Sequence, residues 1–319
     1  MTVFLTGASG YLGSVVLEKL VDAGYPVRAL IRRKDSETRP VSQRQEVEII
    51  MGDLLDLAAV AREAARADAV IHAGFAHQAD FTSALEHDRQ LALGMITALK
   101  GSGKPFIFSS GGMITVDQAV GERSEQLVTE EMDVLKTCPS FIRPRALAER
   151  DVETGAQIGV RTIVMRLGSV YGRGGSHFIP MMIEAAKKSG FVTYIGRGLN
   201  VWPHVHVEDV ADAYILALRK APAGSLFNVA DKEFDMVTLA RLIAKAMDLE
   251  QPQSISLDAA HRTWGPFADP LAANGRFSSR KIHEVLGWKP QGPSVEEELL
   301  RGSYRSMIEG RKPAGYRPH

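Results

Sequence analysis

A glycine-rich turn near the N-terminus constrains the fold of this chain more than any other stretch. The segment from Thr6 to Gly13, TGASGYLG, joins the apolar run at 3–5 to a segment with the apolar spacing of a helix. Glycine is needed where a backbone bends tightly or touches a ligand, and a helix N-terminus offers unpaired N–H groups to an anion. The stretch therefore predicts a strand, a turn and a helix that together hold phosphate. Its G-x-x-G-x-x-G spacing differs from the more common G-x-G-x-x-G, and an ordinary glycine-rich turn is the alternative.

Composition narrows the class of protein and of partner. The chain has 319 residues, 45% hydrophobic and 24% charged, which is typical of a globular protein with a full-sized core. Lysine plus arginine equals aspartate plus glutamate at 38 each, so no overall field attracts nucleic acid or an anionic membrane surface. We therefore expect a small-molecule substrate and neither a nucleic-acid nor a membrane partner.

Cysteine content and apolar runs bear on compartment and metal binding. The single cysteine, Cys138, cannot form an intramolecular disulfide, and no cysteine or histidine cluster has the spacing of metal ligands. No apolar run reaches the ~18 residues that a membrane helix needs. The sequence therefore predicts a cytoplasmic protein without a metal site.

Strand and helix patterns alternate through the first half of the chain. Strands are predicted at 27–31, 47–50, 69–72 and 105–108, with helices between them at about 56–66 and up to about 100. Such alternation predicts an α/β fold with right-handed βαβ units and a doubly wound parallel sheet, a Rossmann fold. Ligands gather at the carboxyl ends of such strands, where Asp53, His72, Ser109 and Ser110 fall.

The second half is less regular. A helix at about 144–158 precedes a strand at 162–166, and proline, glycine and aromatic residues become frequent between 172 and 203. We interpret this as a smaller C-terminal α+β substrate lobe. The predicted domains are a dinucleotide-binding domain over 1–170, to which 201–229 returns, and a discontinuous lobe over 171–319. Further helices are predicted at 209–218, near 236–247, at 279–286 and at 295–308.

Six motifs occur in an order that resembles the extended short-chain dehydrogenase/reductase family, which includes sugar-nucleotide epimerases, dehydratases and dihydroflavonol-type reductases. The motifs span nearly the whole chain: TGASGYLG at 6–13, GDL at 52–54, FSS at 108–110, RLGSVYG at 166–172, VHVEDVA at 205–211 and LGWKP at 286–290. One fold hosts many reactions, so the resemblance indicates the fold and the cofactor more strongly than the reaction.

The resemblance implies a site for a nicotinamide dinucleotide. Gly7, Gly10, Tyr11 and Leu12 would line the pyrophosphate, Asp53 and Leu54 would face the adenine, and the backbone at 72–74 would run beneath the cofactor. The full predicted cofactor-binding set is Thr6, Gly7, Gly10, Tyr11, Leu12, Gly13, Arg32, Arg33, Asp53, Leu54, His72, Ala73, Gly74, Ser109, Arg145, Leu167, Gly168 and Val170.

Two arginines after the second predicted strand bear on the choice of nucleotide. Members that use NAD generally place an acidic residue there, whereas Arg32 and Arg33 suit a 2′-phosphate through charge-assisted hydrogen bonds. We therefore predict NADP(H) as the cofactor. Two solvated loop arginines are the alternative, since Lys34 and Asp35 show that the loop is generally charged.

The catalytic residues depart from the family pattern. Members typically carry a tyrosine, which exchanges the carbonyl proton, and a lysine four residues later, which lowers the pKa of that tyrosine. Phe141 and Arg145 occupy these two places, and none of the seven tyrosines has a lysine four residues on. Ser110 matches the serine that orients the substrate carbonyl, with Ser109 as the alternative one residue away. The predicted catalytic set is Ser110, Arg145 and position 141, where the tyrosine is missing.

The expected substrate is small and apolar or aromatic. Sugar-nucleotide members tend to carry an arginine before the VHVED motif, where this chain has Trp202, Pro203 and His204. Arg197, Arg276 and Arg280 are alternative sources of the missing charge. The predicted substrate contacts are Ser110, Phe141, Tyr171, His177 and Trp202. His77, His177 and His204 are candidate acids near neutral pH.

These observations favour an NADP(H)-dependent oxidoreductase of the carbonyl reductase type. Its proton would come from an ordered water, a histidine or an acidic hydroxyl of the substrate. Two alternatives remain open: a catalytically silent NADP(H)-binding sensor or interaction protein, and an epimerase- or dehydratase-like lyase or isomerase. Since the family often dimerises through the helices that correspond here to 83–100 and 144–158, we also expect a homodimer.

Overall fold

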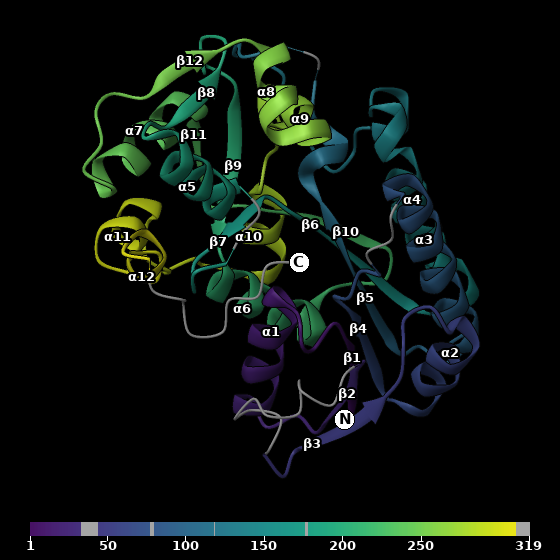
Figure 1. Ribbon diagram of the computed structural model, residues 1–319. Helices are drawn as coiled ribbons and strands as arrows, with labels where there is room; N and C mark the ends of the chain where they lie inside the picture. The colour runs from purple at the N-terminus through teal and green to yellow at the C-terminus, as the bar shows by residue number, and fades with distance from the viewer. Residues whose placement is uncertain (33–43, 77–79, 118, 176–177, 311–319) are drawn as a thin grey trace.

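A parallel sheet forms the centre of the computed structural model, which describes residues 1–32, 44–76, 80–117, 119–175 and 178–310 (Figure 1). Its strands are β1 (Val3–Thr6), β2 (Val27–Ile31), β3 (Val47–Met51), β4 (Ala69–His72), β5 (Pro105–Gly111), β6 (Arg161–Leu167) and β10 (Ser225–Val229). They lie in the order β10-β6-β5-β4-β1-β2-β3, and each neighbouring pair is parallel. The strand order reverses between β1 and β4, so the predicted doubly wound sheet is confirmed.

Helices cover both faces of this sheet. One face carries α1 (Tyr11–Asp22) and α6 (Val207–Lys220), and the other carries α2 (Leu57–Arg66), α3 (Phe81–Ala98) and α4 (Arg143–Thr154) (Figure 1). Successive side chains of a strand point to opposite faces of the sheet, so alternate residues contact different layers of helices. On β5, Ile107 packs with α1 and α6, whereas Phe106 and Phe108 pack with α2, α3 and α4.

A smaller lobe lies beyond the carboxyl ends of the central strands. It contains a sheet of β7 (Ser169–Tyr171), β9 (Val201–His206) and β11 (Lys232–Asp235), and a parallel pair of β8 (Thr193–Ile195) and β12 (Gln253–Ile255). Its helices are α5 (Phe178–Ser189), α7 (Met236–Ala246), α8 (Leu257–Trp264), α9 (Ala268–Ala272), α11 (Val295–Leu300) and α12 (Arg305–Ile308). A separate apolar core, centred on residues such as Trp202, Leu239 and Leu299, holds these elements together.

The chain passes between the two parts more than once. β9 pairs with β7 and β11 in the lobe, whereas of the elements that follow it α6 packs on the central sheet and β10 is one of its strands. Near the end of the chain, α10 (Arg280–Leu286) and Trp288 pack against α6 in the core of the large part. The lobe is therefore built from several separate segments.

Some predicted boundaries were wrong. The strand predicted at 105–108 continues to Gly111, because Ser110 and Gly111 pair with Arg166 and Leu167 of β6. The helix predicted at 144–158 ends at Thr154 and is followed by a 3-10 turn at Gly155–Ile158. The helix predicted at 295–308 is interrupted, since the backbone N–H groups of Gly302 and Tyr304 turn back to bond Glu297 and Glu298. Within the described residues, no helix is both long and apolar enough to cross a membrane.

Candidate functional site

The glycine turn brings the ends of β1 and β4 into close contact. Gly7 has a φ of +75°, and a Cβ there would lie 2.5 Å from the backbone nitrogen of Gly74. A Cβ on Gly13 would lie 2.0 Å from the carbonyl oxygen of Gly7, so the first turn of α1 also touches the strand end. In the described part of the chain no side chain caps α1, whose N-cap residue is Gly10. The cradle therefore exposes backbone N–H groups and fits the diphosphate of a dinucleotide.

The predicted adenine residues lie beside this cradle. Asp53 follows β3, and its carboxylate accepts the N–H of Leu55 at 3.0 Å. The side chain of Leu54 lies next to Gly74, since a Cβ on Gly74 would be 2.9 Å from Leu54 Cδ1. Arg32 is exposed directly after β2. Arg33 falls outside the described residues, as do His77 and His177.

Tyr11 fastens the cradle to the loop that follows β7. Its hydroxyl donates to the carbonyl of Gly172 at 2.8 Å, and a Cβ on Gly175 would lie 2.2 Å from the Tyr11 ring. Burial raises the pKa of Tyr11 well above its usual value, so the hydroxyl stays protonated and remains a donor. Tyr304 of the C-terminal segment accepts the N–H of Gly172 at 3.0 Å and donates to the carbonyl of Gly175.

A buried polar network connects the ends of β1 and β4 to α3 and α4. Thr6 Oγ1 lies 2.6 Å from His72 Nδ1, and His72 Nε2 lies 3.1 Å from Asp88 Oδ1. The other oxygen of Asp88 accepts a hydrogen bond from Arg145 Nη1 at 2.6 Å. Arg145, which the sequence predicts to occupy the position of the family lysine, is therefore ion-paired inside the protein. The same nitrogen donates to the carbonyl of Ser109 at 3.3 Å.

The two serines at the end of β5 point to opposite faces of the sheet. The Ser109 hydroxyl donates to the carbonyl of His72 at 2.7 Å and accepts the hydroxyl of Tyr214 on α6 at 2.6 Å. Ser110 points to the α4 face; it is 6% exposed, and its hydroxyl has no partner among the described residues. The Ser109 hydroxyl is thus hydrogen-bonded within the fold, whereas the buried Ser110 hydroxyl has an unused hydrogen bond for a ligand or an ordered water.

Phe141 lies in a 3-10 turn, Ser140–Ile142, just before α4. It is partly buried in an apolar cluster, which we call the phenylalanine cluster and which also includes Phe75, Met113 and Phe277. The Arg145 guanidinium carbon lies 5.2 Å from the centre of the Phe75 ring and 5.4 Å from that of Phe108. Position 141 therefore presents apolar surface beside the charged network.

Tyr171 and Trp202 use their polar atoms within the fold. Tyr171 donates to the carbonyl of Pro293 at 2.8 Å, and burial raises its pKa. Trp202 is 2% exposed and donates from Nε1 to the carbonyl of Ala273 at 2.9 Å. Their contact with substrate stays a prediction, and each could offer only an apolar ring face.

His204 is unsuited to the role of acid at neutral pH. It is buried, stacked on Phe234 with ring centres 3.9 Å apart, and bonded through Nδ1 to the carbonyl of Trp202. Burial lowers its pKa to about 4, so it is neutral near pH 7.

The segment from β6 to β7 is held by backbone contacts. Gly168 donates to the carbonyl of Val229 at 3.0 Å, and a Cβ there would lie 2.7 Å from the carbonyl oxygen of Pro203. Leu167 is buried and Val170 half-buried against the core of the large part. Their predicted contact with a dinucleotide stays a prediction.

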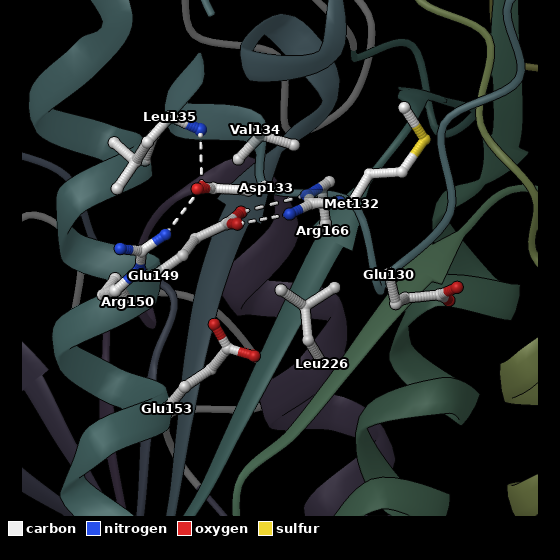
Figure 2. Close-up of a pocket in the computed structure, with 11 residues that line it drawn as sticks. Glu130, Met132, Asp133, Val134, Leu135, Glu149, Arg150, Glu153, Arg166 and Leu226 are labelled. Carbon is white, nitrogen blue, oxygen red and sulfur yellow. Dashed lines mark hydrogen bonds and ion pairs between the residues drawn. The ribbon is translucent and has the colours of Figure 1, made fainter. Parts of the chain in front are cut away.

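A small cavity lies farther along α4, between that helix, β6 and β10. Its volume is about 40 Å³, well below the roughly 300 Å³ of a ligand site, so it suits ordered water. Glu149 faces it and pairs with Arg166 at 2.6 Å, and both are almost fully buried (Figure 2). Burial raises the pKa of Glu130 and Glu153, which also line the cavity.

Sequence reasoning missed Asp88, although a signal was present. The buried face of α3 carries Ala84, Leu85, Leu91, Ala92 and Met95, and Asp88 occupies the same stripe. A carboxylate on an apolar helix face needs a buried partner, because an unpaired charge is costly to bury.

Known proteins share both sequence and fold with this chain. Residues 3–230 match the sequence model of the NAD dependent epimerase/dehydratase family. An uncharacterized protein of Saccharomyces cerevisiae is 32% identical over 307 residues, covering 95% of this chain and 99% of that protein. The 4-hydroxy-2-methyl-3-oxo-4-farnesyl-3,4-dihydroquinoline-1-oxide ketoreductase of Stigmatella aurantiaca is 27% identical over 233 residues, covering 72% of this chain and 68% of that enzyme.

Solved structures agree on the fold. The dTDP-glucose 4,6-dehydratase of Bacillus anthracis, in complex with NAD, matches with a TM-score of 0.78 over 98% of this chain and 99% of that chain, at 16% identity. The resemblance seen in the sequence is confirmed. The chain belongs to the NAD-dependent epimerase/dehydratase family, whose cofactors are nicotinamide dinucleotides.

Proposed function

We propose that this protein is an NADP(H)-dependent carbonyl reductase of a small apolar or aromatic substrate. The observation that carries the proposal is the Ser110 hydroxyl, buried at the carboxyl end of β5 and without a partner among the described residues. A buried hydroxyl in that condition gains a hydrogen bond when a carbonyl oxygen binds beside it. Ser110 would orient the substrate carbonyl and stabilise the negative charge that develops on its oxygen.

The chain's own residues would hold the cofactor across the carboxyl ends of β1, β4 and β5. The N–H groups at the start of α1 would bind the diphosphate, and Arg32 with Arg33 would bind a 2′-phosphate. When bound, NADPH supplies the hydride for the carbonyl carbon. The side chains that surround the carbonyl would exclude water and fix its orientation.

The proton would come from water, from the substrate itself, or from His77 or His177, which lie outside the described residues. Phe141 has no proton to exchange, and Arg145 is paired with Asp88. His204 is neutral near pH 7. The hydroxyls of Tyr171 and Tyr214 donate within the fold, and burial raises the pKa of both.

An acidic hydroxyl next to the carbonyl would meet this need, because it can supply the proton or spread the charge. The phenylalanine cluster beside Arg145 suits an aromatic compound that carries such a pair of groups. The name of the Stigmatella relative, a ketoreductase of a 4-hydroxy-3-oxo-dihydroquinoline, supports a ring ketone with an adjacent hydroxyl, although that hydroxyl is a tertiary alcohol and not an acidic one.

The test is NADPH consumption with matched ketones that carry or lack an adjacent hydroxyl. We expect Ser110→Ala to lower kcat/KM by about 10²-fold, the usual loss when one such donor is removed. Thr162→Val is the matched control, because Thr162 also has a buried hydroxyl without a partner among the described residues but lies near the amino end of β6. Its activity should match that of the native protein.

The outcomes separate the alternatives. Equal rates for the two ketones would exclude substrate assistance and leave water or a histidine, His77 or His177, as the donor. Cofactor binding without turnover of any carbonyl compound, even in Phe141→Tyr with Arg145→Lys, would favour the silent sensor. Isomerised or dehydrated products without net NADPH consumption would favour the epimerase-like alternative.

A further inference from the structure

Asp88 joins two residues of the candidate site that come from different layers of the fold. Its side chain is 2% exposed on the apolar face of α3, where Leu85 and Leu91 are its buried neighbours. One oxygen lies 3.1 Å from His72 Nε2 and the other lies 2.6 Å from Arg145 Nη1. Neither residue is near Asp88 in sequence, so the folded chain assembles the unit.

One arrangement of protons satisfies every hydrogen bond of the network. Thr6 accepts the backbone N–H of Gly74 at 3.3 Å and can donate its hydroxyl proton to His72 Nδ1 at 2.6 Å. His72 Nε2–H then donates to the Asp88 carboxylate, which also accepts Arg145. With neutral His72, the charges of Asp88 and Arg145 cancel.

The charges of the pair are strongly coupled. Burial by itself raises the pKa of Asp88, but the nearby Arg145 and His72 outweigh it and hold this pKa below its usual range. Asp88 is therefore a carboxylate at neutral pH. Arg145 is 13% exposed and lies against two aromatic rings, so little water screens it. Removing either partner leaves an uncompensated charge in a medium of low dielectric constant.

The unit lies in the half of the sheet that receives the second nucleotide of a dinucleotide. In a doubly wound sheet the ligand crosses the strand ends at the switch point, here between β1 and β4, with one nucleotide on each half. His72 ends β4, and Arg145 contacts the carbonyl of Ser109 near the end of β5. The adenine residues lie on the β2–β3 side, so the nicotinamide falls to the β4–β5 side.

We propose that Asp88 is a positioning residue that cancels the charge of Arg145 and thereby sets the relative affinity of the protein for oxidised and reduced cofactor. The proposal rests on the function proposed above. The oxidised nicotinamide ring carries a positive charge that the reduced ring lacks. An uncompensated Arg145 would repel only the oxidised form, whereas the neutral pair accepts both forms and lets oxidised cofactor remain bound after hydride transfer.

The test measures the ratio of the Kd for NADP⁺ to the Kd for NADPH, by fluorescence titration with NADPH and competition with NADP⁺. We expect Asp88→Asn to raise the ratio about tenfold, the order that one unit charge produces at an effective dielectric constant near 20. Arg145→Gln should lower it. The double variant Asp88→Asn with Arg145→Gln is neutral again, so its ratio should return to within about twofold of the native value.

Asp151→Asn is the matched control. Asp151 also joins α3 to α4, through an ion pair with Arg89 at 2.5 Å, but its side chain is 25% exposed, whereas that of Asp88 is 2% exposed. The Asp151→Asn substitution removes the same charge from the same pair of helices, and we expect the ratio of the two Kd values to stay at the native value.

The possible results are distinct. An unchanged ratio in Asp88→Asn, with both cofactors still bound, overturns the inference. If Asp88→Asn does not fold, Arg145→Gln and the double variant still differ only in the charge at position 88, and equal ratios in these two would overturn it. Failure of the native protein to bind either cofactor would instead overturn the proposed function.

Discussion

Gly13→Ala in α1 and Gly94→Ala in α3 should change the free energy of unfolding in opposite directions. The contrast between them tests the cradle at the start of α1. A Cβ on Gly13 would lie 2.0 Å from the carbonyl oxygen and 2.6 Å from the carbonyl carbon of Gly7. Both are backbone atoms of the turn and cannot rotate away. Among the described residues, a Cβ on Gly94, inside α3, would meet only the Cβ of Ala61, at 4.0 Å.

The magnitudes follow from these distances. Alanine stabilises a helix interior over glycine by about 0.5–1 kcal/mol, so Gly94→Ala should raise the free energy of unfolding by about that amount. Gly13→Ala makes the same gain, but α1 and the turn must separate by about 1 Å or more. Such overpacking costs about 1–3 kcal/mol, so the net change should be a loss of about 1–2 kcal/mol.

Cofactor binding should separate the two variants further. Moving α1 away from Gly7 misaligns the N–H groups that would hold the diphosphate, so we expect Gly13→Ala to weaken NADPH binding more than tenfold. Gly94→Ala should bind NADPH as the native protein does. Urea unfolding followed by tryptophan fluorescence gives the stabilities, and titration with NADPH gives the affinities. Native stability and affinity in Gly13→Ala would refute the close contact on which the cradle depends.

Three further predictions concern pH, cofactor choice and assembly. Because the pKa of His204 is about 4 in the fold and about 6.5 when unfolded, the unfolded chain binds more protons between these values, and stability should fall by about 3 kcal/mol from pH 6.5 to pH 4. In His204→Phe, which keeps a ring against Phe234, urea midpoints should fall less steeply with acid; an identical slope would contradict this. Arg32→Asp should reduce the preference for NADPH over NADH at least tenfold by calorimetry, and equal native affinities would count against NADP(H). Helices α3 and α4 lie side by side on the outside of the sheet (Figure 1), so we expect a homodimer through them, which a monomer mass by light scattering would disprove.

The parts of the fold that could be predicted from sequence depend on short-range patterns. The turn at 6–13, the buried strands and the helices between them follow from glycine placement and apolar periodicity, both of which act within a few residues. The end of β5 could not be located in this way. Its last residues, Ser110 and Gly111, are extended because β6 pairs with them, and that partner lies more than 50 positions away in the chain.

The candidate site was predicted only in part, because its side chains also contact residues far away in the sequence. Position in a motif was enough to single out Ser110, yet only the fold shows that Ser109 is hydrogen-bonded to Tyr214 while Ser110 is not bonded within the described residues. Arg145 was predicted as a member of the catalytic and cofactor-binding sets, with no partner named for it. The fold pairs it with Asp88, 57 positions earlier, because α3 and α4 pack together.

The most direct test of the proposed function follows the hydride itself. The native protein is incubated with a hydroxyketone and NADPH that carries deuterium at C4 of the nicotinamide, on each face in separate runs, and the product is examined by mass spectrometry. We predict that label from one face appears on the carbinol carbon, with one deuterium per NADPH consumed. An isomerised or dehydrated product that leaves NADPH unconsumed, or an alcohol without deuterium from either face, would contradict the account.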